Sequence, residues 1–444
     1  MGNKQRSALS QATPADHLHV FRAAGYHSVA QLGDRPKALR VAEDIGALSA
    51  RGESEFVSAA ASIGSSSHTL CHGSGPKPVD GQKSQLTALS IFSGAGGMDL
   101  GFAQAGFDIK LAIEVNDDAC ATYRLNFGHR MLRADLNTLS VSTQIKNVDM
   151  VFGGPPCQGF SVAGAMDPED RRSLLIHRFF DIVDELTPKA FVCENVDGLA
   201  LHKRWRNVRD GLIARAAVNY DITLFVLNAV DFGVPQNRHR MFLVGVRKDI
   251  GIGQGRALFD RIATGITKYE RVAPTVGDIV RQFGPAGSKM NPNTCPAKIT
   301  FLKKPVLRAS AYAGMIFNGG GRPLSPIGWS STLPATMGGN RTPVVDEDEI
   351  FNGTPGFVEE YHRHLITGGK PRAGKVPKRL RRLTINECKT IQGFPTDFQF
   401  AGSKSSVYRQ IGNAVPPPLA RAVAGCVFAI LEEYTSRGQL EAAA

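Results

Sequence analysis

Short apolar runs alternate with amphipathic stretches between residues 86 and 250, and this alternation constrains the fold more than any other feature of the chain. Helical periodicity is clearest at residues 173–186 and 204–218. The apolar runs typical of strands lie at residues 86–92, 107–113, 150–152, 190–193, 222–227 and 241–246. Strands that alternate with helices over short connections build a doubly wound, mostly parallel sheet. The sequence therefore predicts an α/β fold whose ligands bind beyond the carboxyl ends of the strands.

A loop-rich, strongly basic segment follows. Glycine and proline punctuate residues 251–384, and the strand and helix periodicity fades there. The segment carries 20 Lys and Arg against 9 Asp and Glu, so its net charge of +11 accounts for almost all of the +12 of the whole chain. A basic segment beside a neutral one is typical of a module that binds a polyanion such as a nucleic acid.

The last predicted helix, residues 417–434, has one apolar stripe. The stripe consists of Leu419, Val423, Val427, Ile430 and Leu431. A stripe of this length needs a sheet face to cover it, so we expect the C-terminal helix to pack on the first lobe. The basic segment is then an insertion in the chain.

One cysteine stands out from the other six. Cys157 lies in the sequence GPPCQGFS, directly after the predicted strand at residues 150–152. Two prolines fix their φ angles and remove backbone donors, so this loop is stiff and continues neither as strand nor as helix. The pattern indicates a thiol that is presented at a strand end, where open α/β sheets place their chemistry.

A glycine-rich loop and two acids indicate a cofactor site. FSGAGG, residues 92–97, follows the first predicted strand and precedes a helix, so its backbone allows close approach by a ligand. Glu114 ends the next strand and can accept hydrogen bonds from ribose hydroxyls, and Asp135 can accept one from an adenine amino group. Taken alone, this loop is also compatible with a nicotinamide or flavin cofactor.

These segments together resemble the ordered motifs of the cytosine-C5 DNA methyltransferase family, of the bacterial type associated with restriction and modification. GPPCQGFS is similar to the catalytic motif of that family. The other similar blocks are LSIFSGAGGMDLGF (89–102), AIEVN (112–116), ADL (134–136), CENV (193–196), QNRHR (236–240), RRLTINECKTIQGFP (381–395) and YRQIGNAVPPPLA (408–420). The resemblance runs from about residue 86 to about residue 434.

The resemblance implies a Rossmann-like, S-adenosylmethionine-dependent methyltransferase domain with an inserted, loop-rich target-recognition domain. The implied organisation is an N-terminal extension and linker of unknown function (1–84), a catalytic and cofactor-binding domain (85–250), the target-recognition domain (251–384) and a return to the catalytic domain (385–444). The implied contacts to S-adenosylmethionine are Phe92, Gly94, Gly96, Gly97, Glu114, Asp135, Leu136, Pro156 and Asn413. Ala414 stands where members of the family often carry serine.

The resemblance also implies the chemistry. Cytosine C5 is a poor nucleophile, and addition of the Cys157 thiolate to C6 activates it. Glu194 then supports the ring at N3, Arg240 holds the cytosine O2, and Arg238 supports a phosphate or the catalytic loop. The target base must leave the duplex to reach these groups. No side chain is an evident candidate for removing the C5 proton.

Contacts to DNA are expected from the motifs and from the basic segment. Residues 369–382, GKPRAGKVPKRLRR, carry seven cations and no acid, which predicts that they follow phosphates. The residues expected to contact DNA are Ser161, Asn340, Arg341, Lys378 and Arg379. Among these, Asn340 and Arg341 are candidates for reading base edges in the major groove.

The same residues bear on three other functions. The main alternative is an RNA (tRNA) cytosine-C5 methyltransferase with the same motifs. A nicotinamide oxidoreductase would have no use for GPPCQ and ENV. An inactive DNA-binding regulator would not need the catalytic residues. Seven scattered cysteines predict neither disulfides nor a metal site. We expect a cytoplasmic, nucleoid-associated monomer without a membrane span, whose partners are double-stranded DNA and, acting separately, a cognate restriction endonuclease. The recognised sequence cannot be read from these residues.

Overall fold

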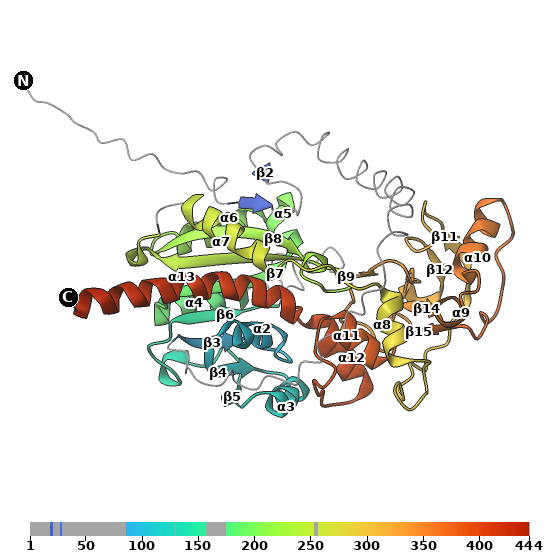
Figure 1. Ribbon diagram of the computed structural model, residues 1–444, viewed down its shortest axis with the longest axis horizontal. Coiled ribbons are helices and arrows are strands. Elements are labelled where there is room, and N and C mark those ends of the chain that lie inside the picture. The colour runs from blue at the N-terminus through green and yellow to red at the C-terminus, as the bar shows by residue number, and fades with distance from the viewer. Residues whose placement is uncertain are drawn as a thin grey trace, which may run out of the picture.

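The computed structural model describes residues 18–20, 27–28, 86–128, 130–156, 175–252 and 256–443. Cys157, Ser161 and nearly all of the N-terminal extension lie outside these residues. In the described part of the chain, nine strands form one mixed sheet (Figure 1). Its strands are β1 (Leu18–Val20), β2 (His27–Ser28), β3 (Thr87–Ile91), β4 (Asp108–Glu114), β5 (Arg130–Arg133), β6 (Met150–Gly153), β7 (Ala190–Val196), β8 (Tyr220–Asn228) and β10 (His239–Arg247).

The strand order is β2-β1-β8-β10-β7-β6-β3-β4-β5. Strands β3 to β7 pair in parallel, whereas β10 runs antiparallel to both of its neighbours, β7 and β8. From β3 the chain moves outward through β4 to β5, and it then returns to the other side of β3 through β6. The order therefore reverses between β3 and β6, and the carboxyl ends of these two strands are where such a sheet binds ligands.

Helices cover both faces of the sheet. On one face the core contains side chains of α2 (Gly97–Ala105), α7 (Arg256–Ile266) and α13 (Pro417–Ala443). On the other face it contains side chains of α4 (Leu175–Leu186), α5 (Asp197–Leu201) and α6 (Arg206–Ala216). Alternate residues of the strands enter the two cores, as the period of a strand requires. The fold is the α/β, Rossmann-like architecture that the sequence predicts.

Helix α13 lies along α2 on this face (Figure 1). All five residues of the predicted apolar stripe belong to its core. The approach is close because Gly101 of α2 has no side chain: a Cβ there would lie 2.6 Å from the Ala420 Cβ and 2.5 Å from the Arg421 nitrogen. By length and composition the stretch Lys404–Gly438 could cross a membrane, but 67% of its apolar window is buried within the protein, as in a core helix.

The second lobe has short elements and two small cores. Its strands are β9 (Gln236–Asn237), β11 (Phe301–Val306), β12 (Met315–Phe317), β13 (Ser330–Ser331), β14 (Val344–Asp346) and β15 (Leu380–Arg382). Its helices are α8 (Val276–Phe283), α9 (Glu347–Asn352), α10 (Phe357–Ile366), α11 (Ile385–Ile391) and α12 (Lys404–Asn413), while α3 (Asp117–Asn126) belongs to the sheet lobe. Both α8 and α11 begin with a capping box, in Thr275 and Asp278 and in Thr384 and Glu387.

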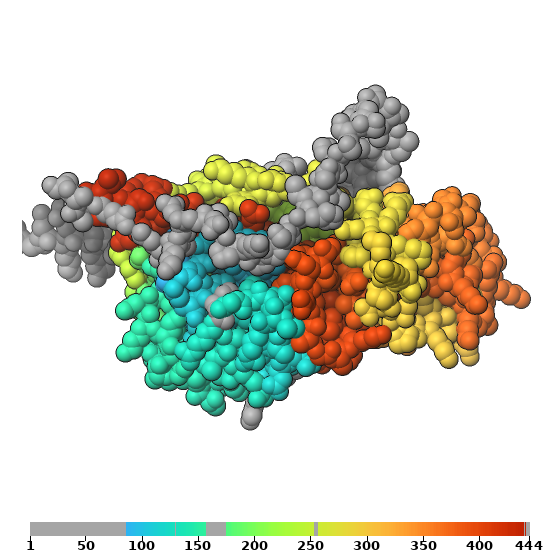
Figure 2. Space-filling model, turned by 60° about the horizontal axis from the view of Figure 1, so that its bottom comes forward, coloured from blue at the N-terminus to red at the C-terminus, as the bar shows by residue number. Residues whose placement is uncertain are grey.

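Segments on both sides of residues 250 and 384, the predicted boundaries, contribute to the same cores. Helix α7 lies after residue 250, yet its apolar side chains are part of the sheet core. Helices α11 and α12 lie after residue 384, yet they share a core with α8. Figure 2 shows this C-terminal segment, in red-orange, between the sheet lobe and the rest of the second lobe. The domain boundaries themselves stay predictions.

Candidate active site

A cavity of about 520 Å³ opens at the carboxyl ends of β3, β4 and β6, where the strand order reverses. Eight of the nine predicted cofactor residues line it, namely Phe92, Gly94, Gly97, Glu114, Asp135, Leu136, Pro156 and Asn413. Gly96 is part of the same loop but does not line the cavity. Glu194 and Arg240 line it as well. The structure thus brings residues from 92 to 413 around one space of a size suited to a small molecule.

The glycine-rich loop is held in an unusual conformation. Phe92 has a φ of 55°, a left-handed conformation that a residue with a side chain seldom adopts. A Cβ on Gly94 would meet no atom within 4 Å, so the loop leaves open space at this point. A Cβ on Gly96 would lie 2.3 Å from the ring of Phe127, so only glycine fits there. Backbone strain of this kind occurs at ligand-binding sites.

Glu114 ties the loop to the end of β4. Its Oε2 accepts a hydrogen bond from the Gly94 N–H at 2.9 Å, and its Oε1 accepts from the N–H groups of Val115 and Asn116. Asp135, after β5, accepts from the backbone and side chain of Asn137. Both carboxylates face the cavity with acceptor capacity to spare, because each has two oxygens with two lone pairs each.

Glu194 and Arg240 form the polar end of the cavity. Arg240 Nε lies 2.9 Å from Glu194 Oε1, and both side chains are almost fully buried. The pair is set by the register of β10 against β7, in which Arg240 lies opposite Val196 and Phe242 opposite Glu194. Burial raises the pKa of the Glu194 carboxyl above its ordinary value, and the charges of Arg240 and Arg238 act against this rise.

The GPP segment lies against this carboxylate. A Cβ on Gly154 would lie 2.8 Å from Glu194 Oε2, so the absence of a side chain allows the contact. Asn195 Nδ2 donates to the Pro155 carbonyl at 3.2 Å, which joins the segment to the end of β7. Pro156, the last described residue before Cys157, lines the cavity.

Arg238 has a different environment from the one predicted for it. Its side chain is buried, and its guanidinium donates to the carbonyls of Leu333, Gly412 and Ala414. These carbonyl contacts inside the protein do not fit the predicted contact to a phosphate. The other predicted role, support of the catalytic loop, concerns residues outside the described ranges and stays a prediction. Arg238 instead fixes the end of α12 against the segment that carries Arg240.

A wide cleft of about 990 Å³ is lined by Asn237 of β9 and by residues between Ser310 and Pro343. Of the residues predicted to contact DNA, Arg341 lines the cleft, and Asn340 is exposed on the same loop. Arg322 and Trp329 also line it and are exposed. Neither residue was predicted from the sequence, although an arginine directly after three glycines and a tryptophan in a loop are signals that could have indicated them.

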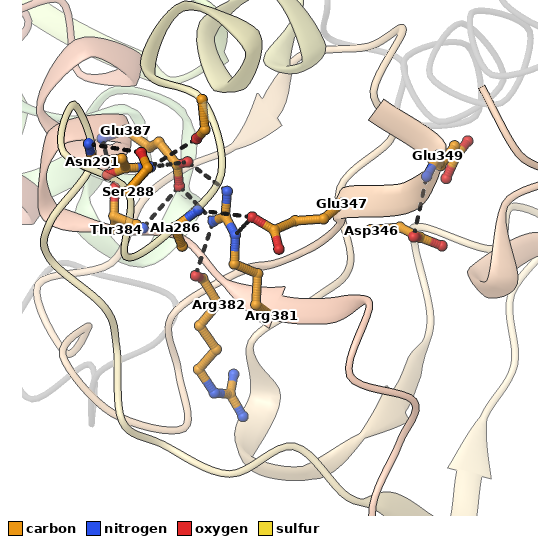
Figure 3. A network of polar contacts seen from close by, with 11 residues as sticks. Ala286, Ser288, Asn291, Asp346, Glu347, Glu349, Arg381, Arg382, Thr384 and Glu387 are labelled. Atoms are coloured by element: carbon orange, nitrogen blue, oxygen red, sulfur yellow. Dashed lines mark hydrogen bonds and ion pairs between the residues drawn. The ribbon is translucent and has the colours of Figure 1, made fainter. Parts of the chain in front are cut away.

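The basic run at residues 369–382 is only partly free to meet phosphates. Lys378 is exposed, as predicted for a DNA contact. Arg379 is not available, because its Nε lies 2.6 Å from the buried Asp346 and its Nη2 donates to Thr354 and Pro355. Arg381 is held inside the lobe by Glu347 and Glu387 (Figure 3), and Arg382 donates to the Thr342 carbonyl. The prediction that Arg379 contacts DNA is therefore wrong in this structure.

Asp99, which the sequence analysis did not single out, lies fully buried in the first turn of α2 and lines the cavity. Its Oδ1 accepts a hydrogen bond from the Tyr123 hydroxyl at 2.9 Å. Burial raises its pKa to about 7, while the hydroxyls of Ser90 and Tyr123 lower it. The signal in the sequence that could have indicated it is a single acidic residue at the start of an otherwise apolar, glycine-rich helix.

We expect Asp99→Asn to change how stability depends on pH. The pKa of about 7 in the folded state lies above the ordinary value of 3.8. Between these two pH values the folded state keeps a proton that the unfolded state has lost. The unfolding free energy of the wild type therefore falls by about 1.4 kcal/mol for each pH unit of increase in this range, whereas that of the variant does not. Urea unfolding at pH 4, 5.5, 7 and 8 measures this. A difference between the two proteins that is independent of pH would contradict the assignment.

The chain is similar to known methyltransferases over most of its length. The model of the C-5 cytosine-specific DNA methylase family matches residues 86–429. Type II methyltransferase M1.HphI of Haemophilus parahaemolyticus is 34% identical over 358 residues, which cover 77% of this chain and 86% of that protein. Type II methyltransferase M.FnuDI of Fusobacterium nucleatum is 30% identical over 342 residues, which cover 76% and 93%.

A solved structure shows the same fold. The Dnmt2 methyltransferase of S. pombe superposes with a TM-score of 0.54 at 18% identity, over 79% of this chain and 99% of that one. The family model spans most of the chain, and the sequence relatives cover more than two thirds of it. The chain belongs to the C-5 cytosine-specific DNA methylase family and is a DNA cytosine-5-methyltransferase.

Proposed function

We propose that the protein transfers a methyl group from S-adenosylmethionine to C5 of a cytosine that is flipped out of a specific duplex DNA sequence, through a covalent bond between Cys157 and C6. The observation that carries the proposal is the buried Glu194–Arg240 pair, with the GPP segment against its carboxylate, at one end of a cavity lined by the family's cofactor motifs. The residue that follows this segment in the chain is Cys157.

The cavity fits S-adenosylmethionine by its size and by the hydrogen-bonding groups that line it. Glu114 and Asp135 are acceptors for the ribose hydroxyls and the adenine amino group, and the open space at Gly94 admits the ligand beside the backbone. Phe92 and Leu136 supply apolar surface for the adenine ring. When bound there, S-adenosylmethionine supplies an electrophilic methyl group.

The protein's residues carry the other parts of the reaction. The Cys157 thiolate adds to C6 of the flipped base, and the C5–C6 double-bond electrons become available at C5. Glu194, whose raised pKa keeps it protonated to a higher pH than an ordinary glutamate, donates to N3 and stabilises the charge on the ring. Arg240 holds the carboxyl group and donates to the O2 atom. Once C5 has bonded to the methyl group, loss of the C5 proton to water expels the Cys157 thiolate and restores the C5–C6 double bond.

The DNA lies in the cleft beside this site. Arg322 and Arg341 supply positive charge and hydrogen-bond donors, and Asn237 places the cleft within three residues of Arg240. Affinity for DNA should fall steeply with salt, because phosphate contacts release counterions. As the relatives are named type II methyltransferases, we further propose that the protein modifies the site of a separate cognate endonuclease.

Transfer of a labelled methyl group to duplex DNA and to transfer RNA tests the substrate class directly. We expect incorporation into DNA, at one cytosine of a short sequence that bisulfite sequencing of DNA from expressing cells identifies. Incorporation into transfer RNA alone would support the RNA alternative and overturn the proposal.

Glu194→Gln should lower the rate of methyl transfer about 10²- to 10⁴-fold, the usual worth of a positioned general acid. In the wild type the rate should fall as the pH rises above the raised pKa of Glu194, and this limb should be lost in the variant. Single-turnover rates between pH 5.5 and 9 measure both effects. Glu432→Gln, at an exposed position of α13, is the matched control. A Glu194→Gln enzyme with the rate and pH profile of the wild type would refute the role.

A further inference from the structure

Carboxyl groups outnumber cations in the lining of the cavity. Asp99, Glu114, Asp135 and Glu194 contribute four carboxyl groups to its lining, and the cations are Arg240 and Arg409. Arg240 is already engaged, by Glu194 at 2.9 Å and by the His239 carbonyl at 2.7 Å. The carboxylate of S-adenosylmethionine, unlike its ammonium and sulfonium groups, gains nothing from a lining rich in carboxyl groups and needs a hydrogen-bond donor or cation of its own. This leaves Arg409.

Arg409 has its donors available. Within the described part of the chain its guanidinium makes one contact, to the Ser406 hydroxyl at 3.4 Å, and it takes part in no ion pair. Its side chain is exposed at the cavity wall. Asn413 lies four residues further along α12, so both residues are on the same face of the helix.

Helix α12 is fixed in position at both sides. Gln410 accepts from the Thr122 hydroxyl of α3 at 2.6 Å and donates to the Ala401 carbonyl. Arg238 donates to the carbonyls of Gly412 and Ala414 at the end of the helix. A guanidinium on a fixed helix is held near its ligand before binding, which reduces the entropy lost on binding.

The end of the helix also contacts the start of α2, directly after the glycine-rich loop. A Cβ on Gly97 would lie 3.1 Å from the Ala414 Cβ, so the start of α2 contacts the residue after α12. Glu114 and Asp135, the acceptors for the adenosine part, come from β4 and from the turn after β5. Ala414 has no hydroxyl to offer a carboxylate, whereas Arg409, one turn earlier, offers a bidentate donor.

We propose that Arg409 binds the carboxylate of the cofactor and thereby selects ligands that carry the intact amino-acid group. The inference rests on the proposed use of S-adenosylmethionine. Arg409 is a binding residue in this account and takes no part in the transfer of the methyl group.

Titration calorimetry with two ligands tests the proposal. One is S-adenosylhomocysteine, and the other is its decarboxylated analogue, which lacks only the carboxylate. Arg409→Met should weaken binding of S-adenosylhomocysteine about tenfold, the usual loss for a charge-assisted hydrogen bond, and should change binding of the analogue less than twofold. Arg409→Lys should lose less than Arg409→Met because it keeps the charge but not the bidentate geometry.

Lys404→Met is the matched control, since it removes an exposed cation of the same helix that does not line the cavity. It should leave both affinities unchanged. Equal losses for both ligands in Arg409→Met, or a loss of affinity for DNA instead, would overturn the role of Arg409 while leaving the proposed function intact. Failure of the wild type to bind S-adenosylhomocysteine would overturn the proposed function itself.

Discussion

Cys157→Ser should bind duplex DNA with the affinity of the wild type and transfer no measurable methyl group. A serine hydroxyl is far less nucleophilic than a thiolate, and without addition to C6 the C5 carbon stays unreactive. A hydroxyl is similar in size to a thiol, so this exchange should not alter the cleft that holds the DNA. Gel-shift affinity and single-turnover methyl transfer, measured on the same preparation, separate the two effects.

Covalent trapping sharpens this test. With S-adenosylmethionine present, a duplex with 5-fluorocytosine at the target position can accept the methyl group but has no C5 proton to lose. The protein should therefore remain bonded to the DNA and migrate with it as one band in denaturing gels. Cys157→Ser should abolish the band, and Cys295→Ser, at a half-buried cysteine of the second lobe, should keep it. A peptide cross-link mapped to any other residue would refute the assignment of the nucleophile.

The sheet was largely predictable because buried strands leave a strong local signal. All six predicted strands are present within a few residues of their expected bounds. Strand β5, RMLR, was missed because it lies at the edge of the sheet, where only two of its four residues are even half-buried. The antiparallel direction of β10 was not predictable from periodicity, since the alternation of a strand does not encode the direction of its neighbour.

Site residues that belong to short motifs could be predicted from the sequence, whereas contacts between distant residues could not. The cofactor loop and its acids are short motifs at strand ends, and the cavity gathers them. The arginines of residues 379–382 were misjudged because a count of charge along the chain cannot see partners far away in the sequence. Asp346 and Glu347 hold Arg379 and Arg381 from 33 and 34 residues earlier in the chain. Glu387, the other partner of Arg381, lies 6 residues later.

Arg381→Met should destabilise the second lobe by about 3–5 kcal/mol, the cost of leaving a buried charge without its partner. Arg381 donates to both oxygens of Glu387, at 2.8 and 2.7 Å, and to Glu347 at 2.6 Å (Figure 3). The Glu387 side chain is fully buried, and it also accepts from Asn291 and from the backbone of Thr384. Methionine fills similar volume, so the loss reports the charge more than the packing.

Denaturant unfolding followed by tryptophan fluorescence measures this loss, because one of the two tryptophans, Trp329, lies in the second lobe and the other, Trp205, in the core of the sheet. Arg256→Met, which breaks an exposed pair with Asp260, should cost less than about 1 kcal/mol. Adding Glu387→Gln to Arg381→Met should restore part of the loss, since the buried charge is then gone. If Arg381→Met costs no more than Arg256→Met, the network does not hold the lobe together, and these arginines would again be candidates for contacting phosphates.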